Sequence, residues 1–170
     1  MIELPRLTFL FGCDKNSPFL EELLNTQQGF YTSHVSLYEV VEVCAVDLCV
    51  KTSDLLEFLR NQNSTQLGQV ALNAYIQSTM DEGLPTIFYD CHNIRDVLPF
   101  AVKYGTDNCL IISVGTPIGS NNALLKEVGN IWIPQMELTK QLSLLEKELN
   151  PPRPTMEDPP PQLDLREPSK

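Results

Sequence analysis

The chain has 170 residues, 42% of them hydrophobic, which is enough to build one globular domain with a buried core. Its formal net charge of −10 and its pI near 4.5 argue against a nucleic-acid groove or an anionic membrane surface as the partner. The sequence has no apolar run of about 18 residues, and its N-terminal apolar stretch is interrupted by charges and proline. We therefore expect a cytoplasmic protein without a membrane span or a signal peptide.

Short apolar segments alternate with longer segments of helical periodicity along the first 150 residues. The predicted strands cover residues 7–11, 34–37, 86–89, 109–114 and 131–133. The predicted helices cover residues 18–25, 38–50, 54–61, 65–82, 94–104, 123–128 and 136–149. Apolar strands separated by helices predict a three-layer α/β fold, with a mostly parallel sheet of about four or five strands covered on both faces.

Serine, proline and glycine mark the ends of several predicted helices. Ser17 is a suitable N-cap and Pro18 a suitable first residue for the helix that follows the first strand, and Gly29 is expected to end that segment. Gly83 is expected to end the helix over 65–82. The apolar side of that helix is predicted to contain Leu67, Val70, Ala71, Ala74, Tyr75 and Thr79.

Residues 151–170 differ in kind from the rest, because they contain seven of the 13 prolines and few apolar residues. We predict two regions: an α/β domain over residues 1–150, and a disordered, acidic, proline-rich tail over residues 151–170. The tail is interpreted as a solvated extension. The alternative is that its proline-rich stretches bind in an aromatic groove of a partner protein.

The five cysteines are interpreted as reduced, buried thiols of a cytosolic protein, because their number is odd and three lie in apolar runs. A zinc site that combines His34 or His92 with cysteines is an alternative, but the spacing matches no known zinc framework. No metal is therefore predicted. The cysteines are Cys13, Cys44, Cys49, Cys91 and Cys109.

The segment after the first strand has the position and length of a phosphate-binding loop, G-x-x-x-x-G-K-[ST]. Gly12 matches the first glycine, but Ser17, Pro18 and Phe19 stand at the second glycine, the lysine and the Ser/Thr. The charge that contacts the phosphates and the hydroxyl that binds Mg²⁺ are then both missing. Only in a shifted frame does Lys15 serve as the phosphate lysine.

Asp90, His92 and Asp96 follow the strand predicted over 86–89. One hypothesis is a general acid–base pair or a metal-ligand set that includes the histidine. The other, which we favour, is a helix cap in which Asp90 or Asn93 accepts backbone N–H bonds and His92 packs. Trp132 is interpreted as an edge-strand or interface aromatic residue.

The carboxyl ends of parallel strands meet at one edge of a sheet, and ligands of such sheets bind there. Gly12, Asp90 and Gly115 each follow a predicted strand, so we expect them to lie close together. The charge beside the loop is negative, which opposes phosphate binding but suits the positive end of a helix dipole. The acids near this loop are Asp14, Glu21 and Glu22.

The order of these elements resembles that of the P-loop nucleoside monophosphate kinases, in particular the branch with phage-type deoxynucleoside monophosphate kinases and animal phosphomevalonate kinase. The resemblance covers about residues 5–149 and rests on residues 7–24, on residues 87–105 and on the closing strand and helix. In that branch a strand ends in D-x-R-x-x-x-[DE]. Here His92 replaces the arginine, and Gly115-Thr116 stand where another phosphate-facing arginine is usual.

The resemblance implies a kinase-like fold, and the departures imply a vestigial phosphate site made of Gly12, Lys15, Ser17, Pro18, Asp90, His92 and Asp96. We predict a catalytically degenerate protein without a cofactor that acts by binding another protein, such as a viral or phage assembly or host-interaction factor. One alternative is an active (deoxy)nucleoside monophosphate kinase with an atypical loop. A second is an acidic module that binds a phosphate-free nucleoside near Gly12 and Asp90.

Overall fold

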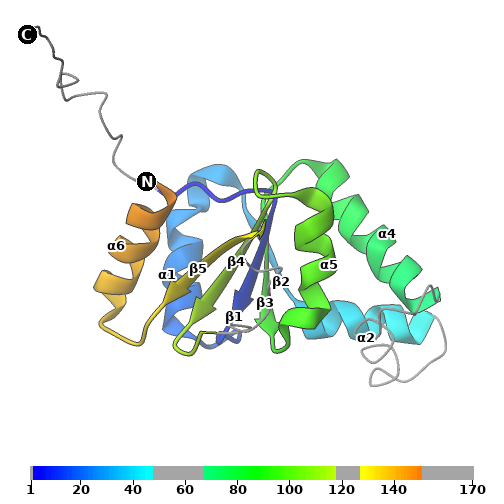
Figure 1. Cartoon of the computed structure of the whole chain (residues 1–170), viewed down its shortest axis with the longest axis horizontal. Helices are drawn as coiled ribbons and strands as arrows, with labels where there is room; N and C mark the ends of the chain where they lie inside the picture. Colours follow the sequence, from blue (N-terminus) through cyan, green and yellow to red (C-terminus); the bar gives the residue numbers. More distant parts are fainter. Residues whose placement is uncertain (1, 48–66, 118–126, 151–170) are drawn as a thin grey trace, which may run out of the picture.

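The computed structural model describes residues 2–47, 67–117 and 127–150, which form a three-layer α/β fold (Figure 1). The sheet consists of five parallel strands in the order β2-β3-β1-β4-β5. This confirms the predicted class. The strands are β1 (Leu7–Phe11), β2 (Ser33–Ser36), β3 (Thr86–Cys91), β4 (Cys109–Val114) and β5 (Gly129–Ile133). The helices are α1 (Pro18–Thr26), the 3₁₀ turn η1 (Gln28–Phe30), α2 (Leu37–Asp47), α4 (Leu67–Glu82), α5 (Ile94–Tyr104) and α6 (Leu138–Leu149).

The strand β1 lies at the centre of the sheet, and all five of its residues are buried. From β1 the chain runs to β2 at one edge, and from β3 it passes β1 to reach β4 and then β5 at the other edge. The connection after β1 and the connection after β4 therefore run toward opposite edges of the sheet. Where two such connections separate, a crevice opens at the carboxyl ends of the two strands, and this crevice is the usual place for a ligand in such sheets.

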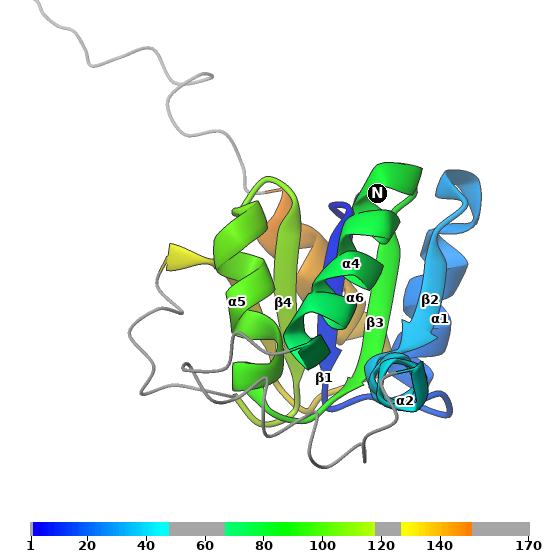
Figure 2. The same ribbon diagram turned by 90° about the vertical axis from the view of Figure 1, so that its right-hand side faces the viewer.

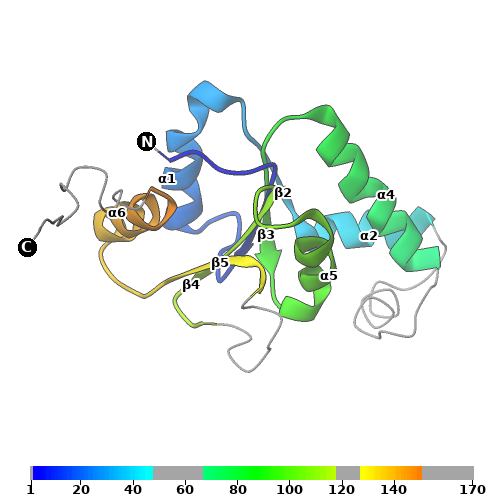
Figure 3. The same cartoon turned by 45° about the horizontal axis from the view of Figure 1, so that its top comes forward.

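Helices cover both faces of the sheet (Figure 3), and each face carries its own hydrophobic core. Figure 2 looks onto the face covered by α4 and α5, which α2 also covers, and here Phe9 stacks on Phe88 with ring centroids 5.2 Å apart. The opposite face is covered by α1 and α6, with Ile2 and Leu4 of the N-terminal segment packed beside them. Within the described ranges, two helices therefore cover the face on which α1 lies, and three cover the other.

Some of the predicted elements match the structure, and others lie outside the residues that it describes. The strand over 7–11, the strand over 109–114 and the helix over 94–104 are confirmed at their predicted bounds. The predicted helices over 54–61 and 123–128 and the predicted tail over 151–170 lie outside the described residues. None of the helices in the described ranges is long and apolar enough to cross a membrane.

Helix α1 ends at Thr26, close to its predicted end at residue 25, and Gly29 lies in the 3₁₀ turn that follows; Gln27 donates its side-chain amide to the Ile2 carbonyl at 2.7 Å. The predicted apolar side of α4 is partly wrong: Thr79 is buried as predicted, but Ala74 and Tyr75 are exposed, and Ile76, which the prediction left out, is buried. Apolar residues occur around most of this helix, so periodicity alone did not determine which side packs. Leu67, Val70 and Ala71 belong to the part of α4 whose side chains are not described.

Candidate functional site

The turn from β1 to α1, residues Gly12–Ser17, is closed by its own polar side chains. The Asp14 carboxylate accepts a hydrogen bond from the backbone N–H of Asn16 at 2.8 Å, which forms an Asx turn. The Ser17 hydroxyl accepts from the backbone N–H of Asp14 at 2.9 Å, and the Ser17 N–H donates to the Asp14 carbonyl at 3.1 Å. Pro18 begins α1 and has no N–H. The N–H groups of Asp14, Asn16 and Ser17 are thus engaged within the loop.

Gly12 is required by the packing of β1 against β4. It has a φ of +83°, and a Cβ at this position would overlap the carbonyl oxygen of Val114. The Cys13 carbonyl accepts a hydrogen bond from the backbone N–H of Asp90 at 3.0 Å. The expectation that Gly12, Asp90 and Gly115 lie together at the carboxyl edge of the sheet is therefore confirmed. The glycine has a structural reason that does not depend on a phosphate.

The three residues at the diagnostic positions of the phosphate-loop pattern serve the fold instead. Ser17 is the N-cap residue by position, but its side chain makes no cap hydrogen bond to α1 and bonds to Asp14 instead. Pro18 is exposed at the first position of the helix. Phe19, at the Mg²⁺-ligand position, is 3% exposed and packs in the core under α1 and α6.

The thiol of Cys13 also lies in this turn, where a thiolate would be a nucleophile close to a helix N-terminus. The pKa of this thiol is raised to about 11, mainly by burial; the hydrogen bond with Ser17 opposes the rise, and the nearby Asp14 carboxylate makes the smallest contribution to it. Cys13 is therefore a neutral, buried thiol at neutral pH. The four described cysteines are buried and form no disulfide with one another, as predicted for Cys13, Cys44, Cys91 and Cys109, and Cys49 lies outside the described residues.

Asp90 lies inside β3, which continues to Cys91, and the prediction that the strand ends before it is wrong. Phe9 pairs with Phe88 but Phe11 pairs with Cys91, so β3 has one extra residue at this point. Asp90 occupies this bulge with a φ of 60°, and its carboxylate accepts a hydrogen bond from the Ser36 hydroxyl at 2.8 Å. The acid thus joins β3 to the end of β2.

The loop before α5 is a helix cap, as the favoured hypothesis predicted. Asn93 is the N-cap residue, and its side-chain oxygen accepts from the backbone N–H of Arg95 at 2.9 Å. Asp96 is 5% exposed in the first helical turn, where its charge suits the helix dipole. His92 is exposed, so the expectation that it packs is wrong. Asn93 caps the helix without a contribution from His92.

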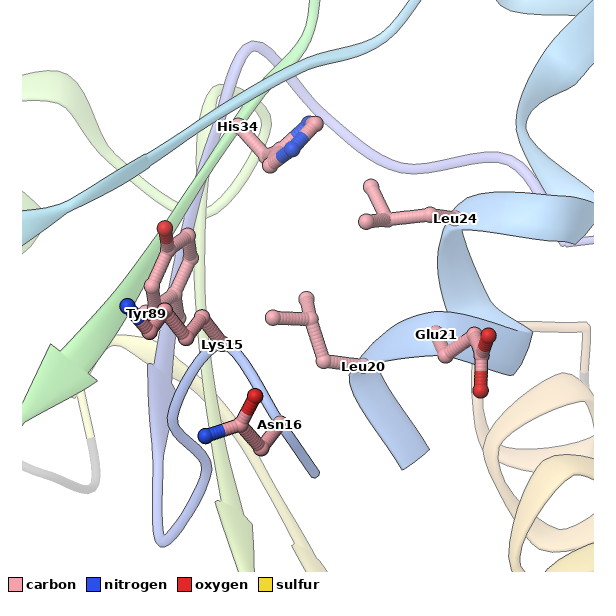
Figure 4. Close-up of a pocket in the computed structure, with 7 residues that line it drawn as sticks. All are labelled: Lys15, Asn16, Leu20, Glu21, Leu24, His34 and Tyr89. Carbon is pink, nitrogen blue, oxygen red and sulfur yellow. The ribbon is translucent and has the colours of Figure 1, made fainter. Parts of the chain in front are cut away.

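A pocket of about 340 Å³ lies between α1 and the part of the sheet formed by β2 and β3. Figure 4 shows Leu20 and Leu24 on the helix side and His34 and Tyr89 on the sheet side. Lys15 extends along the sheet side toward Tyr89, away from the start of α1. The residues that line this pocket are Lys15, Asn16, Leu20, Glu21, Leu24, His34 and Tyr89.

The sequence predicted only Lys15 among the residues of this pocket. Tyr89 and His34 come from neighbouring strands and form a ring pair with centroids 6.3 Å apart. Burial raises the pKa of the Tyr89 hydroxyl, and the carboxylates of Glu39 and Asp90 raise it further. Side chains two positions apart on a strand point to the same face of the sheet. The polar pair His34 and Ser36 on β2 was therefore the sequence signal that could have placed His34 on this face.

No arrangement of three or more histidine, cysteine or acidic side chains in the described ranges could hold a metal ion. No protein-family model matches the chain, and no curated protein matches it.

Proposed function

We propose that this protein is a catalytically silent relative of the P-loop nucleoside monophosphate kinases, and that it acts by binding another protein. The observation that carries the proposal is the self-closed turn between β1 and α1. In that turn a carboxylate and a hydroxyl of the chain occupy backbone donors that a phosphate would need. A triphosphate at the same place would have to displace Asp14, whose negative charge repels it.

The charge distribution supports the same proposal. Phosphoryl transfer depends on cations and oriented donors around the transferred group. Pro18 stands at the lysine position, and Lys15, the cation in this loop, extends toward Tyr89 instead of the start of α1 (Figure 4). Glu21 adds an acid to the first turn of α1. Charge stabilisation of a developing phosphoryl group is missing from these positions.

An exposed aromatic residue on an edge strand supports the second half of the proposal. Trp132 lies on β5, at one edge of the sheet, and is 49% exposed. Its indole N–H donates to the carbonyl of Gly115 at 2.8 Å, so the ring is held in a fixed orientation. Rigid, exposed tryptophans are frequent hot spots of protein interfaces. We propose that the partner contacts the β5 edge, in an assembly or host-interaction role of the kind that the phage-type resemblance suggests.

Turnover assays test the catalytic half. The full chain is incubated with Mg·ATP and each common nucleoside or deoxynucleoside monophosphate, and ADP formation is measured. We expect no turnover above the level of a reaction without the protein. Turnover that depends on both substrates would instead support an active kinase with an atypical loop.

Co-purification from the native source tests the partner half. We expect a protein to be retained by the full chain, and its amount to fall at least about tenfold with Trp132→Ala, as for a hot-spot residue. Tyr31→Ala is the matched control, because Tyr31 is 80% exposed and lies outside β5. Deletion of residues 151–170 tests whether the tail contributes. Equal retention by the wild type and by Trp132→Ala would contradict the β5 interface.

A further inference from the structure

The pocket between α1 and the sheet has two walls that face each other. Leu20 and Leu24, one turn apart on α1, form one wall, and the Tyr89 and His34 rings form the other (Figure 4). Facing apolar and aromatic walls are suited to a planar ring, which can stack on the aromatic side. The volume of about 340 Å³ is at the small end of the range for small-molecule sites, so it suits a single ring system with a small substituent.

The polar groups of the pocket are gathered on the loop and sheet sides. Lys15 offers only donors, whereas Asn16 and the Tyr89 hydroxyl can each donate and accept. Glu21 also lines the pocket, but Figure 4 shows its carboxylate pointing away from the gap between the walls. All three side chains can therefore donate to acceptor atoms at the edge of a ring, and Asn16 and Tyr89 can also accept from a donor there.

The charges around the pocket argue against a highly charged anion. Lys15 is the one lysine or arginine among the described residues that line it, and Asp14 is the next residue but one to Asn16. The carboxylates of Glu39 and Asp90 are close enough to act on the Tyr89 hydroxyl. A phosphate group would meet one cation and several carboxylates. An uncharged ring meets no such repulsion.

We propose that this pocket binds an uncharged planar heterocycle of nucleobase size, held between the leucines of α1 and the rings of Tyr89 and His34. The acceptor atoms of the heterocycle face Lys15 and Asn16. The site borders the turn that closes on Asp14, which supplies Lys15 and Asn16 to its lining, and it can be occupied whether or not the protein has a protein partner. It gives the kinase-like scaffold a ligand without any phosphoryl chemistry.

Adenosine is the probe, titrated into the full chain and followed by calorimetry and by ligand-observed NMR. We expect saturable binding with a Kd on the order of 0.1 to 1 mM, as for a small ligand in a half-open site. Adenine should bind within about threefold of adenosine, because the ring carries the recognition. AMP should bind no more tightly than adenosine, because the phosphate gains no donors and meets carboxylates.

The two histidines of the chain supply a matched pair of variants, since both are exposed and only His34 lines the pocket. His34→Ala should weaken adenosine binding at least about fivefold by removing part of one wall, whereas His92→Ala should leave it unchanged. Lys15→Ala should also weaken binding, and Lys140→Ala, on α6, should not.

Three results would overturn the proposal. The first is that adenosine and adenine show no saturable binding up to about 5 mM. The second is that His34→Ala and His92→Ala change adenosine binding equally. The third is that AMP binds at least about tenfold more tightly than adenosine. The first two would leave the proposed function unaffected. The third would also count against it, because the added phosphate would then have found a favourable site.

Discussion

Two of the turns that connect a strand to a helix at the carboxyl edge, one after β1 and one after β3, contain similar residues. The side chains of these residues form different hydrogen bonds in the two turns. After β3, the Asn93 side chain bonds to the backbone of α5 and caps it. After β1, the Ser17 and Asp14 side chains bond to the backbone of the turn itself and leave α1 without a side-chain cap. The comparison shows that the direction of a few hydrogen bonds decides whether a turn exposes or occupies its donors.

The largest effect is expected at Gly12, which anchors the turn after β1. Gly12→Ala should lower the free energy of unfolding by about 3 kcal/mol or more, because it combines a left-handed φ with an overlap against the Val114 carbonyl. Gly83→Ala is the control: its φ is +81° but nothing lies within 4 Å, so about 1 kcal/mol is expected. Urea denaturation measures both. Equal losses would show that β1 and β4 do not hold Gly12 as tightly as described.

The next effect is expected at Asp14. Asp14→Ala should cost about 1–2 kcal/mol, since the N–H of Asn16 loses its acceptor and the contact with Ser17 is disturbed. Asp14→Asn keeps an acceptor for the Asx turn and should cost less than half as much. Chemical denaturation of the two variants compares them. If Asn proves as harmful as Ala, the carboxylate acts through its charge and not through the turn.

The turn after β3 should respond as an ordinary cap. Asn93→Ala should cost about 1 kcal/mol and speed hydrogen exchange in the first turn of α5, whereas Asn93→Asp should be close to neutral. Ser17→Ala should not speed exchange in α1 in the same way, because its hydroxyl does not bond to the helix. Faster exchange at the start of α1 in Ser17→Ala would remove the distinction between the two turns.

The smallest effect is a pH dependence at Cys13. Its pKa is raised to about 11 from an ordinary value of 9.0, so between these values the unfolded chain loses a proton that the folded chain retains. Unfolding then releases protons, and stability falls as the pH rises from about 9 to 11. Melting temperatures at increasing pH should fall less steeply for Cys13→Ala than for the wild type. Parallel curves would indicate that the thiol is not buried as described.

The α/β class, the five strands and the closeness of Gly12, Asp90 and Gly115 could be predicted, because apolar runs and strand ends are local signals. The strand order could not, since it depends on which strands pair across the sheet. It was not predictable either that the Ser17 hydroxyl would bond to the turn and not to the helix. Serine before proline has the same N-cap signature whether its hydroxyl bonds to the helix or to the turn.

Other differences arise where tertiary contacts override local pattern. The bulge at Asp90 depends on pairing with β1 and on the Ser36 hydroxyl, which lies 54 positions away in sequence. The pocket was missed because its two walls come from α1 and from two strands that are distant in sequence. Of its residues, the sequence singled out Lys15, Glu21 and His34, each for a different reason.

Thermal melting of the full chain with and without about 5 mM Mg·ATP tests the central claim most directly. The self-closed turn predicts a change in melting temperature of less than about 1 °C, because a ligand that does not bind the folded state cannot stabilise it. A rise of about 4 °C or more that grows with Mg·ATP concentration, and that is lost in Gly12→Ala after correction for its own stability, would contradict the account.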